Sequence, residues 1–97
     1  MSILVLLEIE ANAGSEDAVI DVLRRNLGDT RARQGCESVS VHQDQERPTS
    51  ILLVERWATR ADDAAYRAWR AGEGAITEMA PLVTGRRTLR YYDDVDA

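Results

Sequence analysis

The residue types best suited to chemistry stand at the end of one apolar stretch, Ser50–Trp57, which closes on a Glu-Arg-Trp triplet. Successive side chains of a strand point to opposite faces, so Glu55 and Trp57 share one face with Leu53. A carboxylate can accept a substrate proton, and an indole beside it can stack on a flat ring. We therefore expect this corner to form a pocket wall. The structural alternatives are a Glu55 that pairs with an Arg across strands or subunits and a Trp57 that belongs to the core.

The chain has one histidine and one cysteine, and they differ in chemical promise. His42 titrates near neutral pH and shares a strand face with Ser38 and Ser40, so on chemistry alone it is the best candidate for a general base. An ordinary histidine on the strand surface is the alternative. Cys36 has no neighbour in the sequence that would activate a thiolate, and we expect it to be a small buried apolar residue.

Further aromatic side chains follow in a predicted helix and in the last predicted strand. The hydroxyl of Tyr66 can bind a substrate oxygen, and Trp69 on the same helical stripe can stack on a ring, although both side chains also suit a core. Alternation does not decide whether Arg90 or Tyr91 reaches the cavity or a subunit interface. The candidate catalytic residues are His42 and Tyr66, and the candidate substrate contacts are Leu53, Glu55, Trp57, Trp69 and Tyr91.

Composition excludes several classes of protein. The chain of 97 residues is expected to form a single domain, residues 1–97, with a net charge of −5 that disfavours nucleic acid or an anionic membrane as a partner. All basic residues are Arg and none is Lys, which excludes Schiff-base chemistry and a P-loop. One Cys and one His cannot build a usual structural zinc site, so no structural metal is expected. No apolar run is long enough to span a bilayer and the start does not read as a signal peptide, so the expected location is cytoplasmic.

The hydrophobic pattern predicts four strands and two main helices. The strands are expected at residues 3–10, 36–44, 50–57 and 86–92, with helices that begin at Ser15 and Thr59. Gly28 either ends or only interrupts the first helix, and residues 30–34 read as a polar link. The second helix should place Ala65 on its inward stripe with Tyr66 and Trp69. A further short helix is expected at residues 75–80, stopped by Pro81.

This order, βαββαβ, is that of a ferredoxin-like α+β fold with a four-stranded antiparallel sheet. Both helices must then cover the same face of the sheet. Residues 3–6 and 51–54 are apolar on both faces, so the opposite face also needs a cover. The simplest cover is the same face of a second copy, which predicts a homodimer.

Several motifs resemble those of a known family. They are the turn Asn12-Ala13-Gly14 with Glu16, the segment Gly35-Cys36-Glu37-Ser38, the strand Leu53-Val54-Glu55-Arg56-Trp57 and the helix from Arg60 to Trp69. In these features the chain resembles the antibiotic biosynthesis monooxygenase family of dimeric α+β barrel proteins, over nearly its whole length. Many relatives carry a His nine positions after the Trp, where this chain has Tyr66.

The resemblance implies a pocket between the helices and one sheet face. There a small aromatic substrate, such as a quinol, an anthrone or a polyketide-like compound, would react with dioxygen without flavin, haem or metal. Two alternatives stay open. One is a non-catalytic ligand-binding or stress-response dimer, and the other is a different enzyme on this scaffold, such as an isomerase, a cyclase or a haem degrader with His42 as axial ligand.

Overall fold

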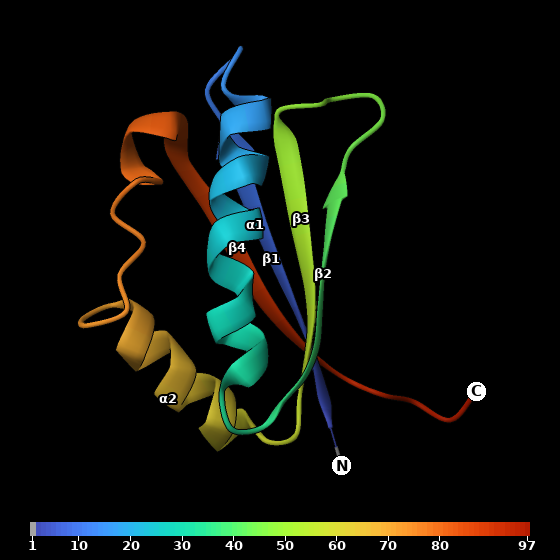
Figure 1. The fold of residues 1–97 in the computed structure, drawn as a ribbon. Helices are drawn as coiled ribbons and strands as arrows, with labels where there is room; N and C mark the ends of the chain where they lie inside the picture. Colours follow the sequence, from blue (N-terminus) through green and yellow to red (C-terminus); the bar gives the residue numbers. More distant parts are fainter. Residues whose placement is uncertain (1) are drawn as a thin grey trace.

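The computed structural model describes residues 2–97 and contains a four-stranded sheet covered by two helices. The elements follow in the order β1 (Ile3–Ala11), α1 (Glu16–Ala32), β2 (Cys36–Gln43), β3 (Ser50–Trp57), α2 (Arg60–Arg70), the 3₁₀ helix η1 (Ala80–Leu82) and β4 (Val83–Asp93). All neighbouring strands are antiparallel, in the order β2-β3-β1-β4. Both helices lie over the same face of the sheet (Figure 1). The predicted ferredoxin-like βαββαβ fold is confirmed.

The register of the two central strands decides which side chains face the helices. Val5 lies opposite Glu55 and Leu7 lies opposite Leu53, so these four side chains share the helical face. The apolar stripe of α1 packs on this face. The main core cluster consists of Leu7, Ala11, Val19, Leu23, Leu27, Val39, Ile51 and Leu53. A second cluster joins Val5, Trp57 and Tyr66 beneath α2.

The first helix is longer than the sequence pattern indicates. It continues through Gly28 and ends at Ala32, so residues 30–32 are helical rather than part of a polar link. Thr30 explains the extension, because this fully buried residue bonds to side chains of α2. Tertiary contacts therefore outweigh the weak helix propensity of Gly28. Ser15 occupies the N-cap as expected, but its side chain makes no capping hydrogen bond.

The short helix predicted at residues 75–80 does not form. The chain passes through turns after α2, and Pro81 lies inside η1 rather than ending a helix before it. Gly74 explains the difference, since its amide bonds to the Trp69 carbonyl and its own carbonyl accepts a bond from Arg70. These bonds hold the segment in a turn.

Two smaller expectations also need correction. Ala65 is exposed, and the inward stripe of α2 carries polar side chains instead. The last strand begins at Val83 rather than at residue 86, with Gly85 inside it at a φ of 88°. The pairing of β1 with β4 shifts register between Ile9 and Ala11. A glycine tolerates the positive φ that such an irregularity requires.

Replacement of Gly35 with Ala is expected to destabilise the fold by about 1–3 kcal/mol. Gly35 has a φ of 84°, and an added Cβ would meet the Cβ and carboxylate of Asp62 at the start of α2. Gly14→Ala is a matched control, because Gly14 has a φ of 90° with no atom within 4 Å of an added Cβ. Urea unfolding should show a clearly larger loss for Gly35→Ala. Equal losses would mean that the contact with Asp62 carries no cost.

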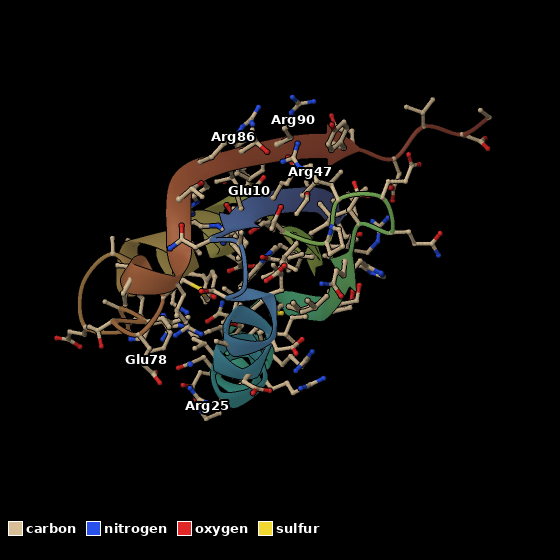
Figure 2. All side chains as sticks on the ribbon, turned by 90° about the horizontal axis from the view of Figure 1, so that it is seen from above. Glu10, Arg25, Arg47, Glu78, Arg86 and Arg90 are labelled. Atoms are coloured by element: carbon tan, nitrogen blue, oxygen red, sulfur yellow. The ribbon has the colours of Figure 1, made fainter. Side chains whose placement is uncertain are left out.

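The sheet face away from the helices has an apolar centre. Its central side chains, from the two middle strands, are half-buried: Leu4, Leu6, Leu52 and Val54. Figure 2 shows Glu10, Arg47, Arg86 and Arg90 along the side of the sheet away from α1. We call the whole sheet face away from the helices the open face. Within residues 2–97, no helix combines the length and the apolar character that crossing a membrane would require.

Candidate functional site

A cavity of about 340 Å³ lies between the helices and the helical face of the sheet. Its walls come from β1, β3, both helices, the segment after α2 and the start of β4. The lining residues are Leu7, Ile9, Leu23, Leu27, Leu53, Glu55, Tyr66, Arg67, Arg70, Ala71, Ile76, Met79, Ala80, Val83, Gly85, Arg86 and Arg87. The lining is mostly aliphatic, and its polar side chains include Glu55 of β3 and Arg67 and Arg70 of α2. An apolar hollow with a few polar groups is typical of small-molecule sites.

The polar end of the cavity is built around Arg67. Its Nη2 donates to Oε1 of Glu55 at 2.7 Å, and its Nε donates to Oδ1 of Asp63 at 3.2 Å. Both carboxylates are almost fully buried, with side chains that are 1% exposed. Burial lowers the pKa of the Arg67 guanidinium, but attraction to Glu55 and Asp63 outweighs burial, so this pKa lies above its ordinary value. Arg67 is therefore held as a cation between two buried anions.

Tyr66 and Arg70 form a second polar group beside the first. The Tyr66 hydroxyl lies 2.6 Å from Oγ1 of Thr30 and accepts a bond from Nε of Arg70 at 2.8 Å. Arg70 also donates to the carbonyls of Asn26 and Gly74. It thus joins α1, α2 and the segment that covers the cavity. Tyr66 is fixed in position by these bonds and presents part of its surface to the cavity.

Tyr91 of β4 closes the network from the far side of Asp63. Its hydroxyl donates to Oδ2 of Asp63 at 2.7 Å, and the Arg60 guanidinium stacks 3.4 Å from the centre of its ring. Burial raises the pKa of the Tyr91 hydroxyl, and the bond to the Asp63 carboxylate raises it further. Tyr91 thus stays a hydrogen-bond donor well into the alkaline range.

Alkaline pH is expected to destabilise the protein partly through Tyr91. Its pKa is higher in the folded than in the unfolded chain, so the unfolded chain loses this proton first. The contribution to stability is complete below about pH 10, the ordinary tyrosine value, and is lost as the pH rises through the folded pKa. Urea unfolding at several pH values should show a shallower alkaline decline for Tyr91→Phe than for the wild type. Parallel declines would contradict the assignment.

The structure places three of the predicted site residues in the cavity wall, namely Leu53, Glu55 and Tyr66. Trp57 shares their sheet face but is fully buried, with Nε1 donating to Oε1 of Glu55 at 2.9 Å. Trp69 is half-buried and lies 6.2 Å from the Tyr66 ring. These two tryptophans and Tyr91 support the wall rather than line it. Glu55 pairs with an Arg as the structural alternative held, but that Arg lies on α2 rather than across strands or subunits.

His42 is not brought to the cavity. It is exposed on the open face, where Nε2 lies 2.8 Å from Oγ of Ser40. Its strand β2 borders a separate groove beside α1. A haem degrader with His42 as its axial ligand would need this side chain on the other face of the sheet.

Sequence reasoning missed most of the polar network. The inward residues of α2 are Asp63, Tyr66, Arg67 and Arg70, which follow the i, i+3, i+4, i+7 spacing of one helical face. From sequence alone, charged side chains at this spacing are usually interpreted as the solvent-exposed face of a helix. The signal that could have found them is the pairing of Asp63 with Arg67 four residues later, on the face that also carries Tyr66. Within residues 2–97, no three His, Cys, Asp or Glu side chains are grouped as metal ligands.

Comparison with known proteins agrees with this architecture. A family model described as antibiotic biosynthesis monooxygenase matches residues 2–76. A search among curated proteins gave no match. Three solved structures that carry the name of this family are similar in fold. One from Nitrosomonas europaea has a TM-score of 0.82 at 18% identity, and the match covers 97% of this chain and 90% of that chain.

The other two structures are similarly distant in sequence. One from Deinococcus radiodurans has a TM-score of 0.81 at 22% identity, covering 98% of this chain and 94% of that chain. One from Bordetella bronchiseptica has a TM-score of 0.78 at 18% identity, covering 97% of each chain. At such identities the likeness shows a shared fold, whereas the family model matches most of the sequence itself. The chain belongs to the antibiotic biosynthesis monooxygenase family.

Proposed function

We propose that this protein is a cofactor-independent monooxygenase that oxidises a small aromatic substrate, such as a quinol, an anthrone or a polyketide-like compound, with dioxygen. The observation that carries the proposal is an apolar cavity that ends in a buried Glu55–Arg67 ion pair. Membership of the monooxygenase family supports it. No flavin, haem or metal is required, since the substrate supplies the electrons.

The cavity suits such a substrate in size and in polarity. Its volume, about 340 Å³, lies at the small end of the range for ligand pockets. Leu7, Leu23 and Leu53 can contact the hydrocarbon part of a ring system. The guanidinium groups of Arg67 and Arg70 offer positive charge where an electron-rich ring would carry its ionised oxygen.

The proposed reaction needs little covalent chemistry from the protein. Loss of a proton from the substrate gives an anion, which passes one electron to dioxygen. The two radicals combine to a peroxide, and loss of water from the peroxide leaves the quinone. For an anthrone, the CH₂ group becomes C=O while one oxygen atom leaves in water. The protein excludes solvent, orients the ring and stabilises the anion.

We further propose that two copies pair through their open faces. The half-buried centre of this surface, formed by Leu4, Leu6, Leu52 and Val54, is apolar enough to gain from a cover. Analytical ultracentrifugation should give the mass of a dimer at micromolar concentration. A stable monomer would contradict the pairing.

Cys36 is a free thiol, which fits the reducing cytoplasm as the proposed location.

A non-catalytic ligand-binding protein is the second candidate. One observation favours it: within residues 2–97, no buried side-chain nitrogen or oxygen lacks a hydrogen-bond partner. Buried polar groups that are satisfied in this way rigidify a binding site, which a ligand-binding protein needs as much as an enzyme does.

Oxygen uptake by the metal-stripped protein separates the two candidates. With an anthrone and with a simple quinol, the wild type should consume oxygen faster than a no-protein control. Tyr66→Phe should lower the rate because it removes the hydroxyl that positions Arg70. Tyr92→Phe is the matched control, since Tyr92 lies outside the cavity, beside Leu4 on the open face, and its ultracentrifugation mass should equal that of the wild type. Binding of the anthrone without oxygen uptake would favour the ligand-binding protein and contradict the monooxygenase.

A further inference from the structure

The polar end of the cavity contains one carboxylate oxygen and one guanidinium nitrogen that the protein does not use. Glu55 accepts bonds from Trp57 and Arg67 through Oε1 alone. Arg67 donates through Nε and Nη2 to Asp63 and Glu55. Oε2 of Glu55 and Nη1 of Arg67 take no part in these bonds. Within residues 2–97, no fully buried side-chain nitrogen or oxygen lacks a partner, so Oε2 of Glu55 is not completely enclosed by the protein.

Glu55 and Arg67 both line the cavity, and the Glu55 side chain, at 1% exposed, is almost fully buried there. We infer that Glu55 and Arg67 act on the substrate as a pair: Oε2 of Glu55 removes the proton of an acidic aromatic hydroxyl, and Nη1 of Arg67 binds the oxyanion that results. The inference rests on the proposed function for its substrate class, an aromatic ring with an ionisable hydroxyl.

The proton transfer leaves the charge of the site unchanged. Before it, Arg67 is balanced by the Glu55 and Asp63 carboxylates. Afterwards Glu55 is neutral, the substrate carries the negative charge, and Asp63 still holds the other side of the guanidinium. The O–H bond of the substrate breaks, an O–H bond forms at Oε2, and no electron moves at this step. A fixed cation at the point where negative charge develops stabilises the product of this step.

The other polar groups near this end are less suited to either role. The Tyr66 hydroxyl is engaged by Thr30 and Arg70, and the Tyr91 hydroxyl is engaged by Asp63. His42 lies on the open face. The geometry therefore favours Glu55 as the proton acceptor, with its orientation fixed by the indole of Trp57 and by Arg67.

The test follows ionisation without oxygen, so that it does not depend on turnover. The probe is 4-nitrophenol, whose anion absorbs visible light, in weak buffer under argon at a pH about one unit below the pKa of the free probe. An adjacent guanidinium lowers the pKa of an acidic group by about 1–3 units, so the bound probe should appear as its anion. Because Glu55 takes the proton, a pH-indicator dye should report far less than one proton released per bound anion.

Two variants and two matched controls complete the test. Glu55→Gln keeps one acceptor oxygen for the bonds from Trp57 and Arg67, so it should fold, but the bound probe should stay mostly neutral and any anion should release a full proton. Arg67→Lys keeps the charge without the second nitrogen, and its anion fraction should fall. Glu46→Gln and Arg24→Lys change exposed residues outside the cavity and should match the wild type. Circular dichroism checks that each variant is folded.

The outcomes separate this inference from the proposed function. A probe that binds the wild type only in its neutral form, or an unchanged anion fraction in folded Glu55→Gln, would overturn the role of the pair. A probe that does not bind at all would contradict the site itself. Anion formation that follows the prediction, together with no oxygen uptake from anthrone, would support the pair and contradict the monooxygenase alone.

Discussion

Replacement of Arg67 with Met is expected to lower the free energy of unfolding by about 3–5 kcal/mol. The side chain lies between the buried carboxylates of Glu55 and Asp63, and Met has a similar length but no charge. Two buried anions would then lack their counter-ion, and the cost of burying them would be uncompensated. Urea unfolding followed by circular dichroism measures the loss.

Arg24→Met is the matched control for this experiment. Arg24 pairs with Asp21 at 2.8 Å, but both side chains are more than half exposed. An exposed pair of this kind contributes at most about 1 kcal/mol. Similar losses of unfolding free energy for the two variants would contradict the claim that the buried Arg67 ion pairs stabilise the fold more than an exposed pair does.

Replacement of Trp57 with Ala should also destabilise the fold by about 3–5 kcal/mol. Trp57 is fully buried, its ring centre lies 5.0 Å from that of Tyr66, and its Nε1 bonds to Glu55. Loss of the indole leaves a void beneath α2 and removes one donor from the buried carboxylate. Differential scanning calorimetry should show a large fall in Tm.

Trp69→Ala provides the comparison, because the same atoms are removed from a half-buried site. The fall in Tm for Trp69→Ala should be clearly smaller, since Trp69 is only half-buried and its ring lies against the guanidinium groups of Arg33 and Arg70. An equal fall in Tm for the two variants would contradict the placement of Trp57 in the core and of Trp69 at its edge.

The strands and their pairing follow closely from the sequence pattern. Residues 50–57 form β3 with the predicted bounds, and alternation in β2 correctly separates Val39 from His42. Period-two alternation is a strong signal because a slip of one residue would expose the core face. The helix ends were harder to predict: the end of α1 depends on Thr30, whose partners lie 36 and 40 residues away along the chain.

The candidate site was only partly predictable for a similar reason. Leu53 and Glu55 could be placed on a pocket wall from strand alternation alone. The cations that complete the site, Arg67 and Arg70, look like solvent-facing residues until α2 is docked on the sheet. Glu55 could not be matched to Arg67 from the sequence, because their contact depends on the angle at which α2 crosses β3. Local sequence patterns determine which face of an element a side chain occupies, whereas tertiary packing determines which other side chains it contacts.

The central claim is that aromatic ligands bind in the cavity of the helical face. The most direct measurement is a titration of ¹⁵N-labelled protein with anthrone under argon, followed by two-dimensional NMR. The indole N–H of Trp57 donates to Glu55 at the end of the cavity, so its resonance should shift in a saturable manner. Saturable shifts confined to the amides of Ser40 and His42 on the open face, with the Trp57 resonance unmoved, would contradict the claim.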